Sequence, residues 1–121
     1  MTSLAETADR ILAGEDSLAA VRDFLDVISH SDADQIASRI GEKPEPTGDA
    51  RIDALLAGLA EHLSITRHVH CPQWVHEPDR FLDRFWFVSE TPGFRAIAIA
   101  QTPIALKRRG VFWPARSLLR V

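Results

Sequence analysis

The sequence predicts an all-α protein: a compact single domain, residues 1–121, built as a bundle of about six to seven short helices. Three observations predict this fold class. Apolar residues recur at intervals of three and four, the spacing of one helix face. Residues that commonly cap helix starts precede these stretches, and glycines follow several of them. A chain of 121 residues with 45% hydrophobic and 26% charged residues has the size and composition of one ordinary globular domain.

The first 41 residues predict three short helices. The first helix is preceded by a capping-box pattern, Ser-x-x-Glu, in which the two residues satisfy each other's free amide groups. The second and third helices each follow a break that contains Asp and Ser, which are favoured at helix starts. The residues expected to cap or end the three helices are Ser3, Gly14, Asp16 or Ser17, Ser31 or Asp32, and Gly41.

The longest helix is expected after a proline-containing loop, residues 42–48. Asp49 caps this helix, which should fray near Arg67. Its apolar residues trace one face: Ile52, Leu55, Leu56, Leu59 and Leu63. Gly58 lies inside the helix, where glycine costs roughly 1 kcal/mol relative to alanine. We therefore expect Gly58 to permit a close contact with another helix.

Residues 77–113 hold two of the three Trp and five of the six Phe. Large aromatic side chains bury the most apolar area per residue, so this stretch is expected to anchor the core. Pro78 marks a helix start, and Phe81 and Phe85 would share one face of that helix. Residues 85–88 fit either a continued helix or a short strand.

Two Thr-Pro pairs, at Thr91 and Thr102, predict two further helix starts. Residues 96–100 alternate at period two, as a strand does, but the preceding Thr-Pro pair favours a helix. The next helix ends at a glycine, and residues 111–113 are then extended. A minimal two-stranded pairing between residues 85–88 and 111–113 is therefore compatible with the pattern.

The sequence contains no motif that predicts catalysis. It lacks a Gly-rich phosphate loop, a nucleophile elbow and an H-E-x-x-H pair. The carboxylates and arginines of residues 77–84 have the spacing of ion pairs on a helix surface. The histidines and the cysteine between His62 and His76 lack the spacing of a zinc site, although whether this cluster binds a metal stays open. We expect no enzyme activity, no cofactor and no metal.

Charge is distributed unevenly along the chain. Residues 1–70 hold 13 acids and 6 bases, net −7, and residues 71–121 hold 4 acids and 8 bases, net +4, which sum to −3. Such asymmetry indicates either a surface for an acidic partner or nucleic acid, or charges that neutralise one another within the domain. Trp113 fits a core position equally well. The candidate partner-binding residues are Lys107, Arg108, Arg109, Trp113, Arg116 and Arg120.

The chain is expected to be cytoplasmic. Its first ten residues lack the basic and apolar regions of a secretory signal, and charge interrupts its apolar runs, so no membrane span is predicted. The single cysteine, Cys71, cannot form an internal disulfide, which fits a reducing compartment.

From Pro46 to Phe112 the chain resembles a group of small, uncharacterised bacterial proteins. Their C-terminal half reads W-x-x-E-P-x-R-F-L-x-x-x-W-F, then a helix, then P-x-x-x-x-R-R-G-[IV]-F. The matching residues here are Trp74, Glu77, Pro78, Arg80, Phe81, Leu82, Trp86, Phe87, Pro103, Arg108, Arg109, Gly110, Val111 and Phe112. The N-terminal helix departs from the group. Proteins of this group are often encoded beside nucleotidyltransferase-like partners in toxin–antitoxin-like pairs.

The resemblance implies a non-enzymatic, antitoxin-like protein that binds a nucleotidyltransferase-type enzyme. Such an enzyme has a carboxylate-lined cleft, which an arginine-rich surface would complement. The alternative is a nucleic-acid-binding transcriptional regulator that uses the basic C-terminal end. A helix-turn-helix reader is disfavoured, because the third predicted helix is acidic. The sequence leaves the oligomeric state open.

Overall fold

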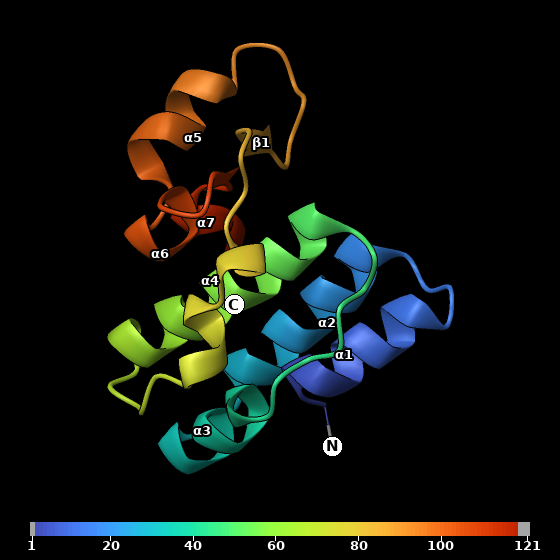
Figure 1. Ribbon diagram of the computed structural model, residues 1–121. Helices are drawn as coiled ribbons and strands as arrows, with labels where there is room; N and C mark the ends of the chain where they lie inside the picture. Colours follow the sequence, from blue (N-terminus) through green and yellow to red (C-terminus); the bar gives the residue numbers. More distant parts are fainter. Residues whose placement is uncertain (1, 119–121) are drawn as a thin grey trace.

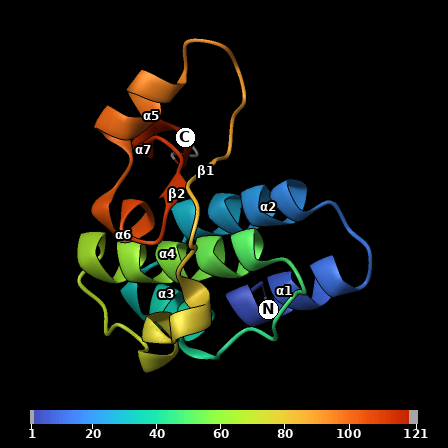
Figure 2. The same ribbon diagram turned by 45° about the horizontal axis from the view of Figure 1, so that its top comes forward.

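The computed structural model describes residues 2–118 and confirms the all-α fold class. Over these residues the chain forms seven α-helices, two 3-10 helices and one pair of two-residue strands. The helix α4 (Ala50–Thr66) runs through the middle of the molecule, and residues 86–118 lie above it in both Figure 1 and Figure 2. In this described range, no helix is both long and apolar enough to cross a membrane.

The three N-terminal helices begin where the capping residues predict. They are α1 (Leu4–Leu12), α2 (Ser17–Ser29) and α3 (Ala33–Gly41). The Ser3 hydroxyl accepts a hydrogen bond from the Glu6 amide at 3.1 Å. Asp16 caps α2 in the same way, and Asp32 and Gln35 exchange two hydrogen bonds, each 2.9 Å long. These side chains satisfy amide groups that a helix start leaves unpaired.

The predicted cap of the longest helix is also confirmed, because the Asp49 carboxylate accepts from the Arg51 amide at 2.9 Å. The predicted apolar face of this helix is buried, with none of its five residues more than 6% exposed, but burial extends further around the helix than predicted. Besides the leucine face, α4 buries Ala54, Ala57 and Glu61. A helix that is covered on nearly all sides is a central core element. The helix α4 contacts α3, the 3-10 helices, and a short helix and a strand of residues 81–118, which we call the C-terminal layer.

Gly58 allows the close contact that the sequence predicts. A Cβ added to Gly58 would overlap the Leu106 side chain and come within 3.4 Å of the Ala105 carbonyl oxygen. Both residues belong to the helix α6 (Ile104–Lys107), which packs directly on α4. The glycine therefore makes room for the buried Leu106 side chain between α4 and α6.

The core is centred on α4 rather than on the aromatic stretch of residues 77–113. Phe112 and Trp113 from that stretch are buried, at 5% and 3% exposure, but Phe85 is 75% exposed. Most of the buried apolar side chains come instead from α1 to α4. The core is therefore mainly aliphatic, and the aromatic residues Phe24, Trp74 and Trp113 pack within it.

Arg80 fastens the loop of residues 42–48 to α4. It lies at the end of two short 3-10 helices, η1 (Gln73–His76) and η2 (Pro78–Arg80). The buried guanidinium donates to the Pro44 carbonyl at 2.9 Å and to the Asp53 carbonyl at 3.2 Å. It also lies over the Trp74 ring, 5.0 Å from its centre. Arg80 is therefore not the helix-surface ion-pair residue that its spacing suggests.

The 3-10 helix ends at Arg80 and Phe81 has extended backbone, so the prediction that Phe81 and Phe85 share a helix face is wrong. The strands β1 (Trp86–Phe87) and β2 (Val111–Phe112) then pair in parallel, which confirms the minimal pairing. Backbone hydrogen bonds extend the pairing on both sides, from the Leu82 amide to the Arg109 carbonyl at 2.9 Å and from the Val88 amide to the Phe112 carbonyl at 3.1 Å.

The chain between the two strands is helical. Residues 96–100 lie in α5 (Arg95–Gln101), so the helical interpretation of that stretch is confirmed. The helix begins later than its Thr-Pro pair predicts, because residues 91–94 form a turn with Gly93 at φ +81°. The short helix α7 (Ala115–Leu118) follows β2 and ends the described part of the chain.

Candidate partner-binding surface

Arg109, the centre of the predicted basic site, is completely buried against α4. Its Nη1 forms an ion pair with Oε1 of Glu61 and donates to the Ala105 carbonyl at 2.8 Å. Its Nη2 donates to the Val75 carbonyl at 2.6 Å. Burial lowers the pKa of Arg109, and the hydrogen bond to Glu61 opposes that shift. The guanidinium joins three parts of the fold and offers no surface to a partner.

Trp113 is buried and does not contribute to an exposed surface. Trp113 is only 3% exposed and belongs to the hydrophobic core, the alternative that its sequence context left open. Arg120 lies outside the described residues. The structure therefore does not bring the six predicted residues together as one exposed basic site.

The other three predicted residues do reach the surface. The Arg108 side chain is 45% exposed, lies over the Phe81 ring and places Nη1 3.3 Å from Oε2 of Glu61. Arg116 is exposed and lies over the Phe94 ring, 5.6 Å from its centre. Lys107 is half-buried. Exposed arginines stacked on aromatic rings keep their charge available while losing part of their side-chain freedom.

A continuous row of aromatic rings ending in an arginine, which the sequence reasoning missed, lies beside the strand pair. We call Phe85, Phe112, Phe87 and Arg95 the aromatic–arginine row. The rings of Phe85 and Phe112 meet edge to face at 5.1 Å, and those of Phe112 and Phe87 stack at 4.8 Å. The Arg95 guanidinium lies 4.8 Å from the centre of the Phe87 ring. The alternation Phe-Trp-Phe at residues 85–87 is the signal that could have revealed it, since alternate residues of a strand share a face.

Exposed apolar side chains gather in the same C-terminal layer. Among the described residues, three of the five exposed large hydrophobic side chains belong to it. These are Phe85 at 75%, Ile99 at 52% and Ile104 at 65% exposure. Residues 81–118 also contain six bases and two acids, which gives a net charge of +4. One of these bases, the buried Arg109, is neutralised by Glu61 of α4. The layer therefore combines exposed apolar area with unneutralised positive charge.

The histidine cluster does not assemble a site. Over residues 2–118, no group of three or more His, Cys, Asp or Glu side chains could hold a metal ion. His62 lies apart on α4, where burial lowers its pKa below the ordinary value of 6.5. The imidazole of His62 is therefore mostly uncharged at neutral pH.

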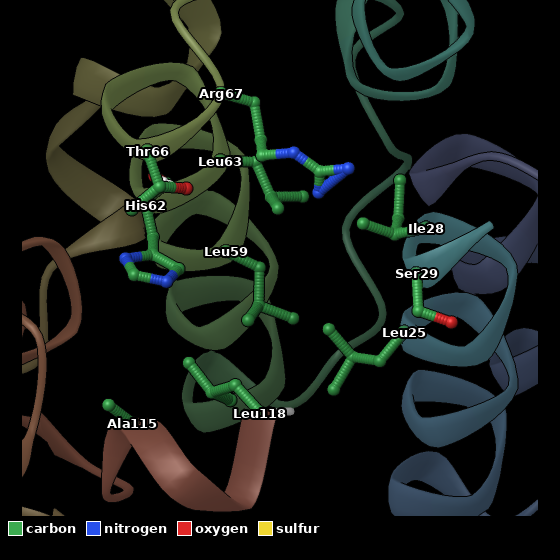
Figure 3. Close-up of a pocket in the computed structure, with 10 residues that line it drawn as sticks. All are labelled: Leu25, Ile28, Ser29, Leu59, His62, Leu63, Thr66, Arg67, Ala115 and Leu118. Carbon is green, nitrogen blue, oxygen red and sulfur yellow. Dashed lines mark hydrogen bonds between the residues drawn. The ribbon is translucent and has the colours of Figure 1, made fainter. Parts of the chain in front are cut away.

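A groove lies between α2 and α4 and is also lined by α7. Its volume is about 480 Å³, and ten residues from α2, α4, the end of α4 and α7 line it (Figure 3). Leu25 and Ile28 form one wall, and Leu59 and Leu63 form the other. Leu118 closes one end, and Arg67 lies at the other.

The chain matches no family model, no curated protein and no solved structure.

Proposed function

We propose that the protein is a non-enzymatic binding module that docks on an acidic partner through the aromatic–arginine row. The observation that carries the proposal is that the two ends of this row, Phe85 at 75% exposure and the exposed Arg95, reach the surface, while the buried Phe112 ring and the half-buried Phe87 ring lie between them. Aromatic and arginine side chains supply most of the energy of protein interfaces. The exposed Phe85 ring is removed from water only when a partner covers it, and this burial would stabilise the complex.

We further propose that the partner is a cytoplasmic nucleotidyltransferase-type enzyme, which the protein neutralises as an antitoxin. The resemblance to proteins encoded beside such enzymes supports this partner. Arg95, Arg108 and Arg116 supply the positive charge that a carboxylate-lined cleft would attract. Arg109 takes no part in docking, because its charge is paired with Glu61 inside the fold.

The test is co-expression of the full chain with the products of its adjacent genes, followed by size-exclusion chromatography and an assay of growth arrest. We expect a stable complex and relief of toxicity with the natural chain. The double variant Phe85→Ala/Arg95→Glu should lose both. The matched control is Leu12→Ala/Arg22→Glu, which changes an exposed apolar residue and an exposed arginine of the N-terminal helices and should retain both.

Two outcomes would overturn the proposal. If no adjacent gene product co-elutes, the antitoxin assignment fails. If Phe85→Ala/Arg95→Glu remains folded by circular dichroism and still neutralises the partner, the aromatic–arginine row is not the docking surface. Charge-reversal variants of Arg109 are unsuitable for this test, since they would disrupt the core.

Nucleic-acid binding is the alternative that the same variants address. The exposed bases of the C-terminal layer favour it, and the burial of Trp113 and Arg109 removes one stacking group and one phosphate contact from the predicted site. Binding to upstream DNA that weakens steeply with salt and is lost on Arg95→Glu would favour a regulator over an antitoxin.

A further inference from the structure

We propose that the groove between α2 and α4 binds a small monocarboxylate with a hydrocarbon body, such as a medium-chain fatty acid. This site is separate from the aromatic–arginine row and does not depend on the proposed function. Its volume of about 480 Å³ lies within the range of small-molecule pockets, roughly 300–1,000 Å³.

The walls of the groove are apolar and face each other across an open space. Leu25 and Ile28 of α2 lie opposite Leu59 and Leu63 of α4 (Figure 3). Each of these four residues is largely covered, with at most 6% exposure, yet the two helices leave the groove open between them. A hydrocarbon chain in the groove would contact both walls and would be removed from water.

One end of the groove carries the charge that fixes the class of ligand. Arg67 extends its guanidinium from the end of α4 toward α2, as Figure 3 shows. Its Nη2 donates to the Ser31 carbonyl at 3.2 Å, which uses one of the five N–H groups of a guanidinium. The remaining N–H groups can donate to a carboxylate, the partner for which arginine has matching geometry.

The other polar side chains that line the groove are not permanent cations that would bind an anion in place of Arg67. Ser29 and Thr66 donate their hydroxyl groups to carbonyls of their own helices, at 2.6 Å and 3.0 Å. The remaining polar lining residue, His62, has a pKa lowered by burial and is mostly neutral at pH 7. None of the ten described residues that line the groove is Asp or Glu. Arg67 is therefore the one permanent charge among them, and it selects an anionic head group.

The test is titration of the full chain with decanoate and with decanol, below the concentration at which decanoate forms micelles. Residues 119–121, which the structure does not describe, follow Leu118 directly, so the full chain is required. Binding is followed by calorimetry and by the methyl NMR signals of Leu25, Ile28 and Leu59. We expect decanoate to shift these signals and to bind about tenfold more tightly than decanol, the effect of a charged hydrogen bond.

Four variants separate the contribution of the Arg67 charge from that of the groove volume. Arg67→Met should bring decanoate binding down to the level of decanol, while Arg22→Met, an exposed arginine of α2 that does not line the groove, should leave both unchanged. Ala115→Trp should fill the groove and abolish binding of both probes. Ser29→Phe does the same from α2 if the first substitution unfolds the short helix α7. The proposal is overturned if decanoate leaves the methyl signals unchanged, or if the folded filling variants bind it as the natural chain does.

Discussion

Arg109 and Glu61 form a buried ion pair between residues that are 48 positions apart in the chain. The carboxylate comes from the middle of α4, and the guanidinium comes from the turn between α6 and β2. Arg109 also holds the Val75 carbonyl, so the pair ties η1 to the same point. This contact, together with the packing of Leu106 on Gly58, joins the C-terminal layer to the helical core.

Replacing one member of this ion pair should cost a large part of the stability. In Glu61→Met the Arg109 guanidinium stays buried without its counter-charge, and the free energy of unfolding should fall by about 3–5 kcal/mol. The double variant Glu61→Met/Arg109→Met should be less destabilised than the sum of the single variants, because no unpaired charge remains. Urea unfolding of the three variants measures this coupling. Arg108→Met, which removes the half-exposed partner of Glu61, should cost less than about 1 kcal/mol.

Gly58→Ala should destabilise the protein although alanine favours helix formation. The added methyl group would overlap the Leu106 side chain, which is fully buried and must shift within a packed core, at a cost of about 1–3 kcal/mol that exceeds the propensity gain. Gly41→Ala is the matched control, since a Cβ there meets no atom within 4 Å and the residue ends a helix. Equal thermal unfolding midpoints for the two variants would contradict the close packing of α6 on α4.

Arg80→Lys should not behave as a conservative substitution. Lysine keeps the charge but cannot reproduce the planar fork that holds the Pro44 and Asp53 carbonyls and stacks on Trp74. A loss of about 2–3 kcal/mol in the free energy of unfolding is expected from the unpaired buried carbonyls. Arg84→Lys, at an exposed position, should stay within about 0.5 kcal/mol of the natural chain. A similar effect of both substitutions in guanidinium unfolding would refute the anchoring role of Arg80.

His62 should make the protein less stable in mild acid. Burial lowers its pKa in the folded state below 6.5, so between these two pKa values the unfolded chain binds more protons than the folded one. The contribution of His62 to the free energy of unfolding therefore rises with pH through this window and is constant above 6.5. His62→Gln should flatten the stability profile there, whereas His76→Gln, at an exposed position, should not. An NMR titration midpoint for His62 at or above 6.5 would disprove the burial effect.

Helix starts were predictable from the sequence because their signals are local. Asp16, Asp32 and Asp49 each cap a helix within three residues of their own position, so a short window contains the whole interaction. Gly58 was also informative, since a glycine inside an otherwise strong helix indicates a close neighbour. The helix start predicted from Thr91 is too early, because the turn at Gly93 delays the start of α5.

The candidate surface could not be predicted in the same way. The side chain of Arg109 looks like part of a basic run, and only the position of Glu61 and the Val75 carbonyl in space turns it inward. One sequence signal pointed to this outcome: Glu61 is a lone carboxylate among the apolar residues at the C-terminal half of α4. The function of the chain, its partner and its compartment stay predictions.

The separation of Glu61 from Arg109 has a consequence for how the chain acquires its structure on the ribosome. Synthesis proceeds at about 5–20 residues per second, so Glu61 is made roughly 2–10 s before the residue that neutralises it. During that interval α4 has its aliphatic residues and its carboxylate but lacks α6 to cover them. The apolar residues that α4 buries against α6 therefore find their cover only after nearly all of the described chain has been made.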